Sequence, residues 1–538
     1  MENSRTKSER LLAFVTWKSI AEYSFVAFSN FLFTYFILGL WNAYFSAPFR
    51  RGGDADFHPI MVRTIEQTGW IFSNAQLGTP KSLTMYDVPQ GGDNLNWIIL
   101  KALSTFVTAT QAVNIHYVLS FVIVAVAAYG AAKWWGLSRP VAFIVAHLYA
   151  FLPYHFFRNV SHQLLTVYAV IPIILVYCYF QVTTGYKLSK IKVVVLAVAT
   201  ASLGAYYAIF SCMLLVTAIL WNLTAKNIKR VKETAVVLIS ICIVFIFNLL
   251  PTIIYRLSNG PNDNIVARSR QDAENFGLQI SNMIAPRQDH RIEAFAKIGS
   301  FIHGIGTVSE TGQALGVIVT LGFFGMLGYA IYCAVTSREI DQRFKYFTML
   351  SILIMVFAVS SGFATFVSSA GITQIRAWNR VVVIIAFIGL LAAGTVIEHI
   401  ADVLKKRQKY MGYAFLVFVL LFGLWDQTST HDRIANDIHA ARFRSDCDFV
   451  QKIEEAKPQH QRVLQVPFMG FPEFPDLNGL THYDQGMLIL CDTDLKFSFG
   501  AMSGRDDTFQ KKISQDNIIT DEETANAARP TFSGVPKH

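Results

Sequence analysis

Long runs of apolar residues, bounded by polar or basic residues, alternate along the chain from about residue 22 to residue 425. Runs of about 20 apolar residues match the length that an α-helix needs to cross the hydrocarbon core of a bilayer. The pattern predicts an all-α, polytopic membrane protein with about eleven membrane-spanning helices. The expected spans are 22–47, 115–135, 140–157, 164–182, two short legs between 192 and 226, 235–255, 315–335, 347–367, 380–400 and 413–425.

The two short legs follow from the charges at their ends. Basic groups lie around Lys192 and Lys226, and the positive-inside rule places both groups in the cytoplasm, so the chain between them must cross twice. The expected outer bend is 204–207. Each leg is short for a ~30 Å core, which predicts a thinned bilayer, a tilt or a partly re-entrant hairpin. Tyr206 and Tyr207 at the bend are typical of an aromatic belt.

Three polar regions are large enough to fold outside the membrane: the loops 48–95 and 256–313 and the tail 427–538. Arg5, Lys7 and Arg10 should keep the N terminus in the cytoplasm, which places all three regions and the C terminus on the opposite, non-cytoplasmic side. We expect a transmembrane domain over 1–426 and a small α/β domain over 427–538. Within the first loop we predict a short helix over 60–72, followed by a helix lying along the interface over 98–113.

The composition agrees with a membrane protein. Hydrophobic residues make up 53% of the 538 residues and charged residues only 15%, which is too apolar for a soluble protein of this size. The net charge of +9 comes from Lys and Arg clustered between apolar runs. This placement is that of cytoplasmic loops, so the positive charge does not indicate a nucleic-acid partner.

Six cysteines are present, and four of them lie inside apolar runs, where they are expected to act as small core residues. Cys447 and Cys491 lie in the polar tail. In an oxidising compartment they are expected to form a disulfide; the alternative is two buried thiols. No cysteine or histidine spacing is typical of a zinc site, so we expect no metal ligands, although two nearby aspartates leave a divalent metal possible.

Ionisable residues suited to proton transfer follow the first span directly. Asp54, Asp56 and His58 lie within five residues, where the chain leaves the bilayer. In an extended loop both aspartates would project to the same side, whereas in a helical turn they would be separated by about 200° and only one could face a reacting centre. We interpret the trio as catalytic; the alternative is that Asp54 caps the following helix.

Arginines on the outer face are contrary to the positive-inside bias, so their presence there requires an explanation. Their guanidinium groups suit phosphate oxygens, so we predict a donor-phosphate site; the alternative is salt bridging to Asp263, Asp272 or Asp289. The candidate phosphate ligands are Arg287, Arg291, Arg376 and Arg380, and the further site candidates are Arg158, His162, Glu274, Asp289 and His290. Arg158 and His162 could instead be anchors at the interface.

The sequence contains no Gly-x-x-x-x-Gly-Lys-Ser/Thr and no Gly-x-Gly-x-x-Gly opening a helix, and it has no Gly-x-Ser-x-Gly. A substrate processed outside the cell must then arrive already activated, because nucleotide donors are cytoplasmic. Lipid-linked intermediates meet that requirement.

An acidic motif after the first span, an interfacial helix, many short spans and a polar tail on the same face resemble the GT-C superfamily of polyprenyl-phosphate-sugar glycosyltransferases. The architectural similarity extends over about 430 residues. The sharpest similarity, to bacterial membrane glycosyltransferases that modify O-antigen, lies in Gly-Asp-Ala-Asp-Phe-His at 53–58, Trp-Ile-Phe-Ser-Asn-Ala-Gln-Leu-Gly at 70–78 and Ile-Arg-Ala-Trp-Asn-Arg at 375–380.

The resemblance implies a donor sugar on undecaprenyl phosphate and a polysaccharide or glycolipid acceptor at the bacterial inner membrane. An aspartate would remove the proton from the acceptor hydroxyl, arginines would stabilise the leaving phosphate, and the anomeric centre would be inverted. No cofactor would be required. A synthase and a flippase for the lipid-linked sugar would be functional partners.

Two other classes of protein share some of these features. A transporter or flippase of lipid-linked sugars would also have many spans and phosphate-binding arginines. The large outer regions and the lack of duplicated halves or charges at mid-membrane argue against it. The second alternative is a non-catalytic assembly subunit, which a sugar-transfer assay would distinguish from an enzyme.

Overall fold

The structure, a computed structural model, describes residues 17–265, 268–305, 310–371, 373–456, 462–477 and 479–515. The N-terminal Arg5, Lys7 and Arg10, on which the predicted orientation depends, lie outside these residues, as does the end of the tail from 516.

The described chain is mostly helical. Its helices are α1 (Trp17–Leu38), α2 (Asp54–Thr68), α3 (Asn94–Ser104), α4 (Ala109–Trp135), α5 (Arg139–Ala150), α6 (Pro153–Arg158), α7 (Val170–Thr183), α8 (Lys190–Ser202), α9 (Ala205–Thr224), α10 (Ile228–Asn259), α11 (Asp272–Asn275), α12 (Ile280–Ile284), α13 (Glu293–Ile305), α14 (Val317–Val335), α15 (Gln342–Ala358), α16 (Phe363–Ser369), α17 (Val382–Arg407), α18 (Lys409–Gln427), α19 (Asp437–Glu455) and α20 (Thr508–Gln515). Short 3-10 helices include η5 (Trp378–Val381), η6 (Thr430–Asp432) and η7 (Asp484–Leu490). The strands β1 (Ser73–Asn74) and β2 (Leu83–Thr84) pair antiparallel, and β3 (Arg462–Val463) and β4 (Lys496–Phe497) pair parallel.

Among the described residues, nine helical segments are long and apolar enough to cross a membrane. The chain is therefore a multi-pass membrane protein. Two further expected spans are occupied by shorter helices, α8 with 13 residues and α15 with 17 residues. The predicted short leg before the outer bend is thus α8, whereas the second leg, α9, is a helix of 20 residues.

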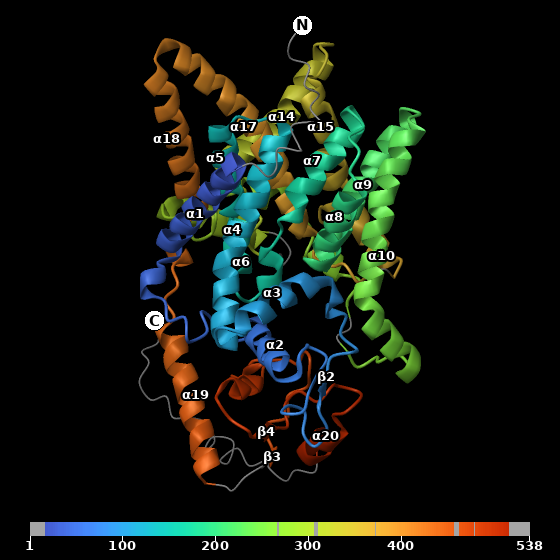
Figure 1. Cartoon of the computed structure of the whole chain (residues 1–538), viewed down its shortest axis with the longest axis vertical. Coiled ribbons are helices and arrows are strands. Elements are labelled where there is room, and N and C mark those ends of the chain that lie inside the picture. The colour runs from blue at the N-terminus through green and yellow to red at the C-terminus, as the bar shows by residue number, and fades with distance from the viewer. Residues whose placement is uncertain are drawn as a thin grey trace.

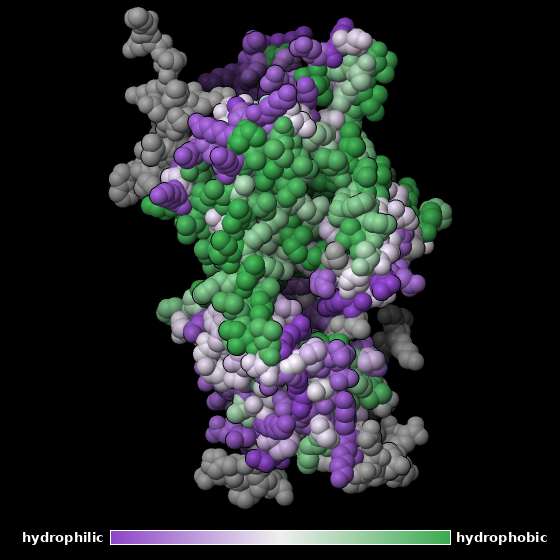
Figure 2. All heavy atoms as spheres, turned by 90° about the vertical axis from the view of Figure 1, so that its right-hand side faces the viewer, coloured by the Kyte–Doolittle hydropathy of each residue, from purple (hydrophilic) through white to green (hydrophobic). Residues whose placement is uncertain are grey.

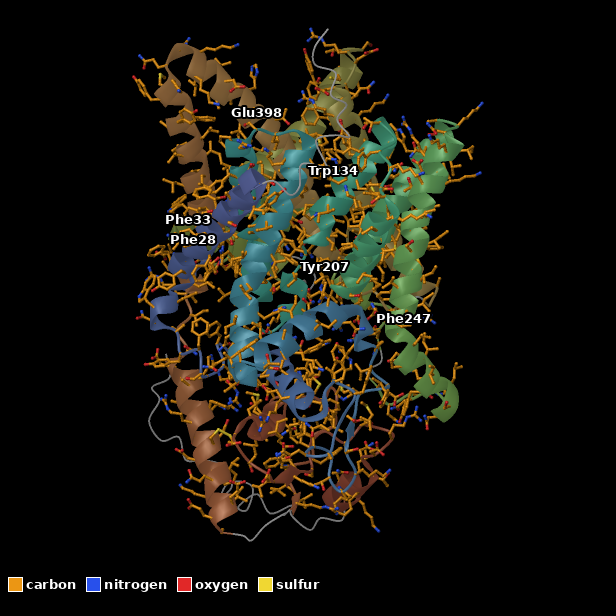
Figure 3. The ribbon with its side chains drawn as sticks, viewed as in Figure 1. Phe28, Phe33, Trp134, Tyr207, Phe247 and Glu398 are labelled. Carbon is orange, nitrogen blue, oxygen red and sulfur yellow. A yellow bond between two sulfur atoms is a disulfide. The ribbon has the colours of Figure 1, made fainter. Side chains whose placement is uncertain are left out.

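Apolar side chains cover the outside of the helical bundle. Only 17% of the most apolar window of α10 is buried, and Phe247 on this helix is 69% exposed. Figure 3 shows Phe28 and Phe247 on opposite outer sides of the bundle, with Tyr207 between them in its interior. Figure 2 shows a hydrophobic surface over the middle of the molecule, bounded by polar surfaces above and below. A lipid environment explains this exposure.

Small residues bring the central helices close together. A Cβ added to Gly322 of α14 would meet the carbonyl oxygen of Gly389 on α17 at 2.1 Å. Neither glycine could therefore be replaced without moving a helix, which is the way that membrane helices gain close packing.

Several predicted boundaries are wrong, including that of the span expected over 347–367, where α15 ends at Ala358. The first span ends at Leu38 rather than at 47, because Gly39 adopts a left-handed conformation that ends α1. The helix expected over 60–72 begins at Asp54 and ends at Thr68. The interfacial helix expected over 98–113 ends at Ser104, since Thr108 forms a capping box that starts α4.

The outer regions lie together at one end of the bundle (Figure 1). The first loop and the tail share a single hydrophobic core, in which Phe57 and Ile60 of α2 pack with Phe471, Tyr483 and Phe499. Buried Asp87 of the loop pairs with Arg505 of the tail, which also bonds to the carbonyl oxygens of 259 and 260 in the second loop. The described part of the tail consists of α19, two-residue strands, short helices and irregular chain.

Cys447 and Cys491 form a disulfide, which confirms the predicted pair. It ties α19 to the residue that follows η7, across a separation of 44 residues.

Candidate active site

Two glycines turn the chain into α2. Gly52 and Gly53 have φ angles of 96° and 56°, in the left-handed region that favours glycine, and the helix begins at the next residue. Asp54 and Asp56 therefore lie in the first helical turn, where carboxylates interact favourably with the helix dipole. The helical alternative for this pair is correct: the side chain of Asp54 is 48% exposed and that of Asp56 is fully buried.

The carboxylate of Asp56 is fully engaged by neighbouring groups of the protein itself. Its carboxylate accepts hydrogen bonds from Arg51 Nε and from the backbone N–H of Gly52, both at 3.0 Å. Arg51 is itself buried and also pairs with Asp446 at 2.8 Å and Asp484 at 3.5 Å, two residues of the tail. This arrangement makes Asp56 a structural residue rather than a base open to a substrate.

Asp54 lies between two histidines from distant parts of the chain. His482 Nε2, in the tail, is 3.4 Å from one carboxylate oxygen, and His162 Nε2 is 3.6 Å from the other. Burial raises the pKa of Asp54, but interactions with the neighbouring histidines, first of all the hydrogen bond from His482, outweigh burial, so the pKa lies below its usual range. Asp54 is therefore ionised at neutral pH.

The pKa values of the two histidines shift in opposite directions. The hydrogen bond to Asp54 raises the pKa of His482 although burial opposes the shift. Burial and the nearby Arg158 and Arg380 lower the pKa of His162 to about 4, so this ring is neutral at pH 7. One carboxylate oxygen of Asp54 thus faces His482, whose hydrogen bond favours the charged form of the carboxylate, and the other oxygen faces the neutral ring of His162.

His58 does not join this exposed group. Its ring is only 5% exposed, and it packs near Trp97, with ring centroids 6.3 Å apart. Burial lowers the pKa of His58 to about 4. The expectation that His58 lies with Asp54 and Asp56 at an open site is wrong, because the helix directs its ring into the core.

Next to His162, two buried arginines share one carboxylate. Glu310 accepts a hydrogen bond from Arg158 Nη1 at 2.6 Å and from Arg380 Nη2 at 2.8 Å. Burial raises the pKa of Glu310, but Arg380 and Arg158 hold it well below its usual range. Two guanidinium groups and one carboxylate leave one net positive charge, and Arg158 Nε is buried with no hydrogen-bond partner among the described residues.

The predicted aromatic belt is wrong in part. Arg380 lies over the ring of Tyr206, 4.2 Å from its centroid, a cation–π contact that holds the guanidinium in place. Tyr207 is fully buried, and its hydroxyl is 3.0 Å from that of Tyr154. Tyr207 therefore lies in the core rather than at a lipid boundary, whereas Tyr206 is half-buried.

The remaining predicted phosphate ligands have partners of their own. Arg287 is buried and forms paired hydrogen bonds with Asp289 and Asp432. Arg376 lies 3.7 Å from Asp272, and Arg291 donates to the backbone oxygen and hydroxyl of Thr428. Salt bridging therefore accounts for Arg287 and Arg376, through two of the aspartates named as alternatives.

The other site candidates stabilise loops. Glu274 accepts hydrogen bonds from Ser361, which lies between α15 and α16, and from Thr365 in α16. His290 lies 3.9 Å from Asp426 and accepts a bond from the backbone of Ile292. In the part of the chain that the structure describes, no three His, Cys, Asp or Glu side chains are grouped to hold a metal ion.

Sequence comparison finds no matching family model and no matching curated protein. The chain is similar to the crystal structure of ArnT from Cupriavidus metallidurans bound to undecaprenyl phosphate, with 11% identity over 93% of this chain and 89% of that chain and a TM-score of 0.48. It is also similar to the archaeal oligosaccharyltransferase AglB from Archaeoglobus fulgidus in complex with an inhibitory peptide and a dolichol-phosphate, with 11% identity and a TM-score of 0.43. That similarity covers 82% of this chain and 59% of AglB.

Proposed function

We propose that the protein is an integral-membrane glycosyltransferase that transfers a hexose from undecaprenyl phosphate to a cell-surface polysaccharide or lipopolysaccharide O-antigen. The reaction takes place at the periplasmic face of the bacterial inner membrane. The observation that carries the proposal is the position of a half-exposed, ionised Asp54 3.6 Å from His162, next to which the buried Arg158 and Arg380 share Glu310.

Asp54 acts as the general base. Its carboxylate takes the proton from an acceptor hydroxyl while the hydroxyl oxygen attacks the anomeric carbon of the donor sugar. The bond from that carbon to the phosphate oxygen breaks, and undecaprenyl phosphate leaves with the bonding electrons. Attack opposite the leaving group inverts the anomeric centre.

Arg380 and Arg158 stabilise the leaving phosphate. The net positive charge of the two arginines and Glu310 suits an anion that gains charge as the bond breaks. Arg158 Nε, which has no partner among the described residues, supplies a donor for a phosphate oxygen. The phosphate ligands are thus assigned to Arg158 and Arg380 rather than to Arg287, Arg291 or Arg376.

No cofactor enters this reaction, and chelation of divalent metals should leave the rate unchanged. The donor must be made and moved to the outer leaflet by other proteins, so a lipid-linked-sugar synthase and a flippase are expected functional partners.

The test uses the purified protein with radiolabelled undecaprenyl-phosphate hexoses and lipopolysaccharide. We expect label in the polysaccharide and release of undecaprenyl phosphate. Arg380→Lys keeps the charge but loses the fork of donors, so it should raise the KM for the donor and not that for the acceptor. Arg343→Lys, in an exposed ion pair at the other end of the bundle, is the control.

The transferase proposal would be refuted if no donor yields labelled polysaccharide and the protein moves the labelled lipid across the membrane of vesicles that contain it. That result would support a transporter or flippase instead.

A further inference from the structure

A cavity of about 550 Å³ adjoins the candidate active site and has no part in the proposed reaction. One wall is the segment 49–51, which leads directly into Asp54, and another is 156–160, which leads to His162. The remaining walls come from the start of α4, from the second outer loop at Arg287, and from the segment that joins α18 to α19. The cavity is therefore bounded by the same two segments that carry Asp54 and His162.

Two of the four arginines that line the cavity are already neutralised. Arg51 pairs with three carboxylates and Arg287 with two. Arg50 and Arg433 are exposed, and neither guanidinium has an ion pair or a side-chain hydrogen bond among the described residues. These two free guanidinium groups make the mouth of the cavity positive, and His431 and His439 line it beside them.

The inner wall is aromatic. Phe49, Tyr117 and Phe156 are each less than 9% exposed, and Phe156 and Phe157 flank the guanidinium of Arg287 at 5.5 and 5.4 Å from the ring centroids. A cavity with apolar walls and a cationic mouth suits an amphiphile that has an anionic head.

The cavity lies next to the end of α1, because Arg433 and Ile434 of its lining contact that end. The backbone N–H of Ile434 bonds to the carbonyl oxygen of Leu38, the last residue of α1, at 2.8 Å, and the side chain of Arg433 lies against Gly39. Trp41 and Tyr44, in the same segment, are 50% and 47% exposed, as is typical of aromatic side chains at the membrane boundary. Figure 1 shows the chain after α1 on the same side as the connection from α18 to α19.

The wall between the cavity and His162 contains a strained residue. Asn159 has a φ of 39°, in a region that non-glycine residues seldom adopt. Such strain persists where the surrounding structure imposes it, and it clusters at ligand-binding sites.

We propose that this cavity binds a phosphate headgroup of net negative charge presented from the outer leaflet, with Arg50 and Arg433 as the ligands of the phosphate. Guanidinium groups bind phosphate oxygens through paired, charge-assisted hydrogen bonds, which neutral lipid headgroups cannot replace. The source of the phosphate is either a lipid headgroup or free phosphate. The proposal does not depend on the sugar-transfer reaction.

The experiment measures binding by the purified protein in detergent, with dioctanoyl phosphatidate, dioctanoyl phosphatidylcholine and inorganic phosphate as probes. We expect saturable binding of phosphatidate that is at least about tenfold tighter than that of phosphatidylcholine. Arg50→Gln with Arg433→Gln should weaken phosphatidate binding about tenfold or more, since charge-assisted bonds to both arginines are lost. If inorganic phosphate displaces phosphatidate, free phosphate is sufficient for binding. If it does not displace phosphatidate, the ligand is the lipid headgroup.

The control replaces Arg444 and Arg462 by Gln, which removes the same charge from exposed positions outside the cavity. Thermal unfolding without ligand checks that both double variants are folded, which their exposed positions predict. A second control, Arg380→Lys, should leave phosphatidate binding unchanged while weakening the donor site.

Equal binding of phosphatidate and phosphatidylcholine would overturn the proposal. So would wild-type phosphatidate affinity in the cavity variant, or a loss of affinity in Arg380→Lys alone, which would locate the lipid at the donor site.

Discussion

Replacing each aspartate of the acidic pair by asparagine separates two roles that the sequence could not separate. Asp54→Asn should fold normally and lose sugar transfer, whereas Asp56→Asn should lose stability. Asparagine keeps the size of the side chain and removes both its charge and its proton affinity, so the two variants differ only in where the charge is lost.

The structure gives the magnitudes. The carboxylate of Asp54 is 48% exposed and the nearest imidazole nitrogens, those of His482 and His162, lie 3.4 and 3.6 Å away, so its loss should cost less than about 1 kcal/mol of folding free energy. Asp56 is fully buried against Arg51 at 3.0 Å. Removing one partner of a buried pair costs about 3–5 kcal/mol. We expect about 3 kcal/mol, since Asp446 and Asp484 still neutralise Arg51.

The assays are unfolding of the purified variants and release of undecaprenyl phosphate under saturating donor. Removal of a general base typically reduces the rate about 10²- to 10⁴-fold, which is the loss expected for Asp54→Asn at nearly wild-type stability. Wild-type turnover by Asp54→Asn would refute its assignment as the base. Equal stability of the two variants would refute the argument from burial.

Three further predictions concern charge, covalent structure and topology. Glu310→Gln should destabilise the protein by about 3–5 kcal/mol, because two buried arginines lose their carboxylate, whereas exposed Glu293→Gln should change stability by less than about 0.5 kcal/mol. Because folding lowers the pKa of Glu310, the stability that its charge contributes is complete above the ordinary pKa of 4.5 and is lost as the pH falls toward the lower pKa of the folded state. The melting temperatures of the wild type and the variant should therefore differ at pH 7 and converge only in acid. Cys447→Ser should cost about 4 kcal/mol on loop-entropy grounds, and thiol counting on the unfolded wild type without reductant should find the four thiols of the other cysteines rather than six. A cysteine in place of exposed Arg270 should react with an impermeant reagent in intact cells, and its protection would overturn the proposed orientation.

The membrane class and the region of the site could be predicted from the sequence. Apolar runs and basic flanks depend only on local composition, and they located the helices of the bundle, although α1 and α15 end at Leu38 and Ala358 rather than at the expected 47 and 367. The boundaries that failed, at Leu38, Asp54 and Ser104, are set by single residues such as Gly39 and by the Thr108 capping box. A hydropathy pattern averages over these residues.

The partners of the site residues could not be predicted in the same way. His482 is 428 positions from Asp54, and Glu310 is 152 positions from Arg158 and 70 from Arg380. No spacing rule connects residues at such separations. The signal that was available for Glu310 is chemical: a lone carboxylate close to a predicted span, in a loop rich in arginine. It indicates a buried ion pair but does not identify the partners.

The tail completes the site rather than standing apart from it. Arg51, beside the acidic pair, is neutralised by Asp446 and Asp484 of the tail as well as by Asp56 of its own loop. The tail also supplies His482 to Asp54, and its aromatic residues bury the inner face of α2. Loss of the tail would leave a buried arginine short of two carboxylates and an apolar helix face in water. The orientation of Asp54 is therefore fixed only when loop and tail pack together.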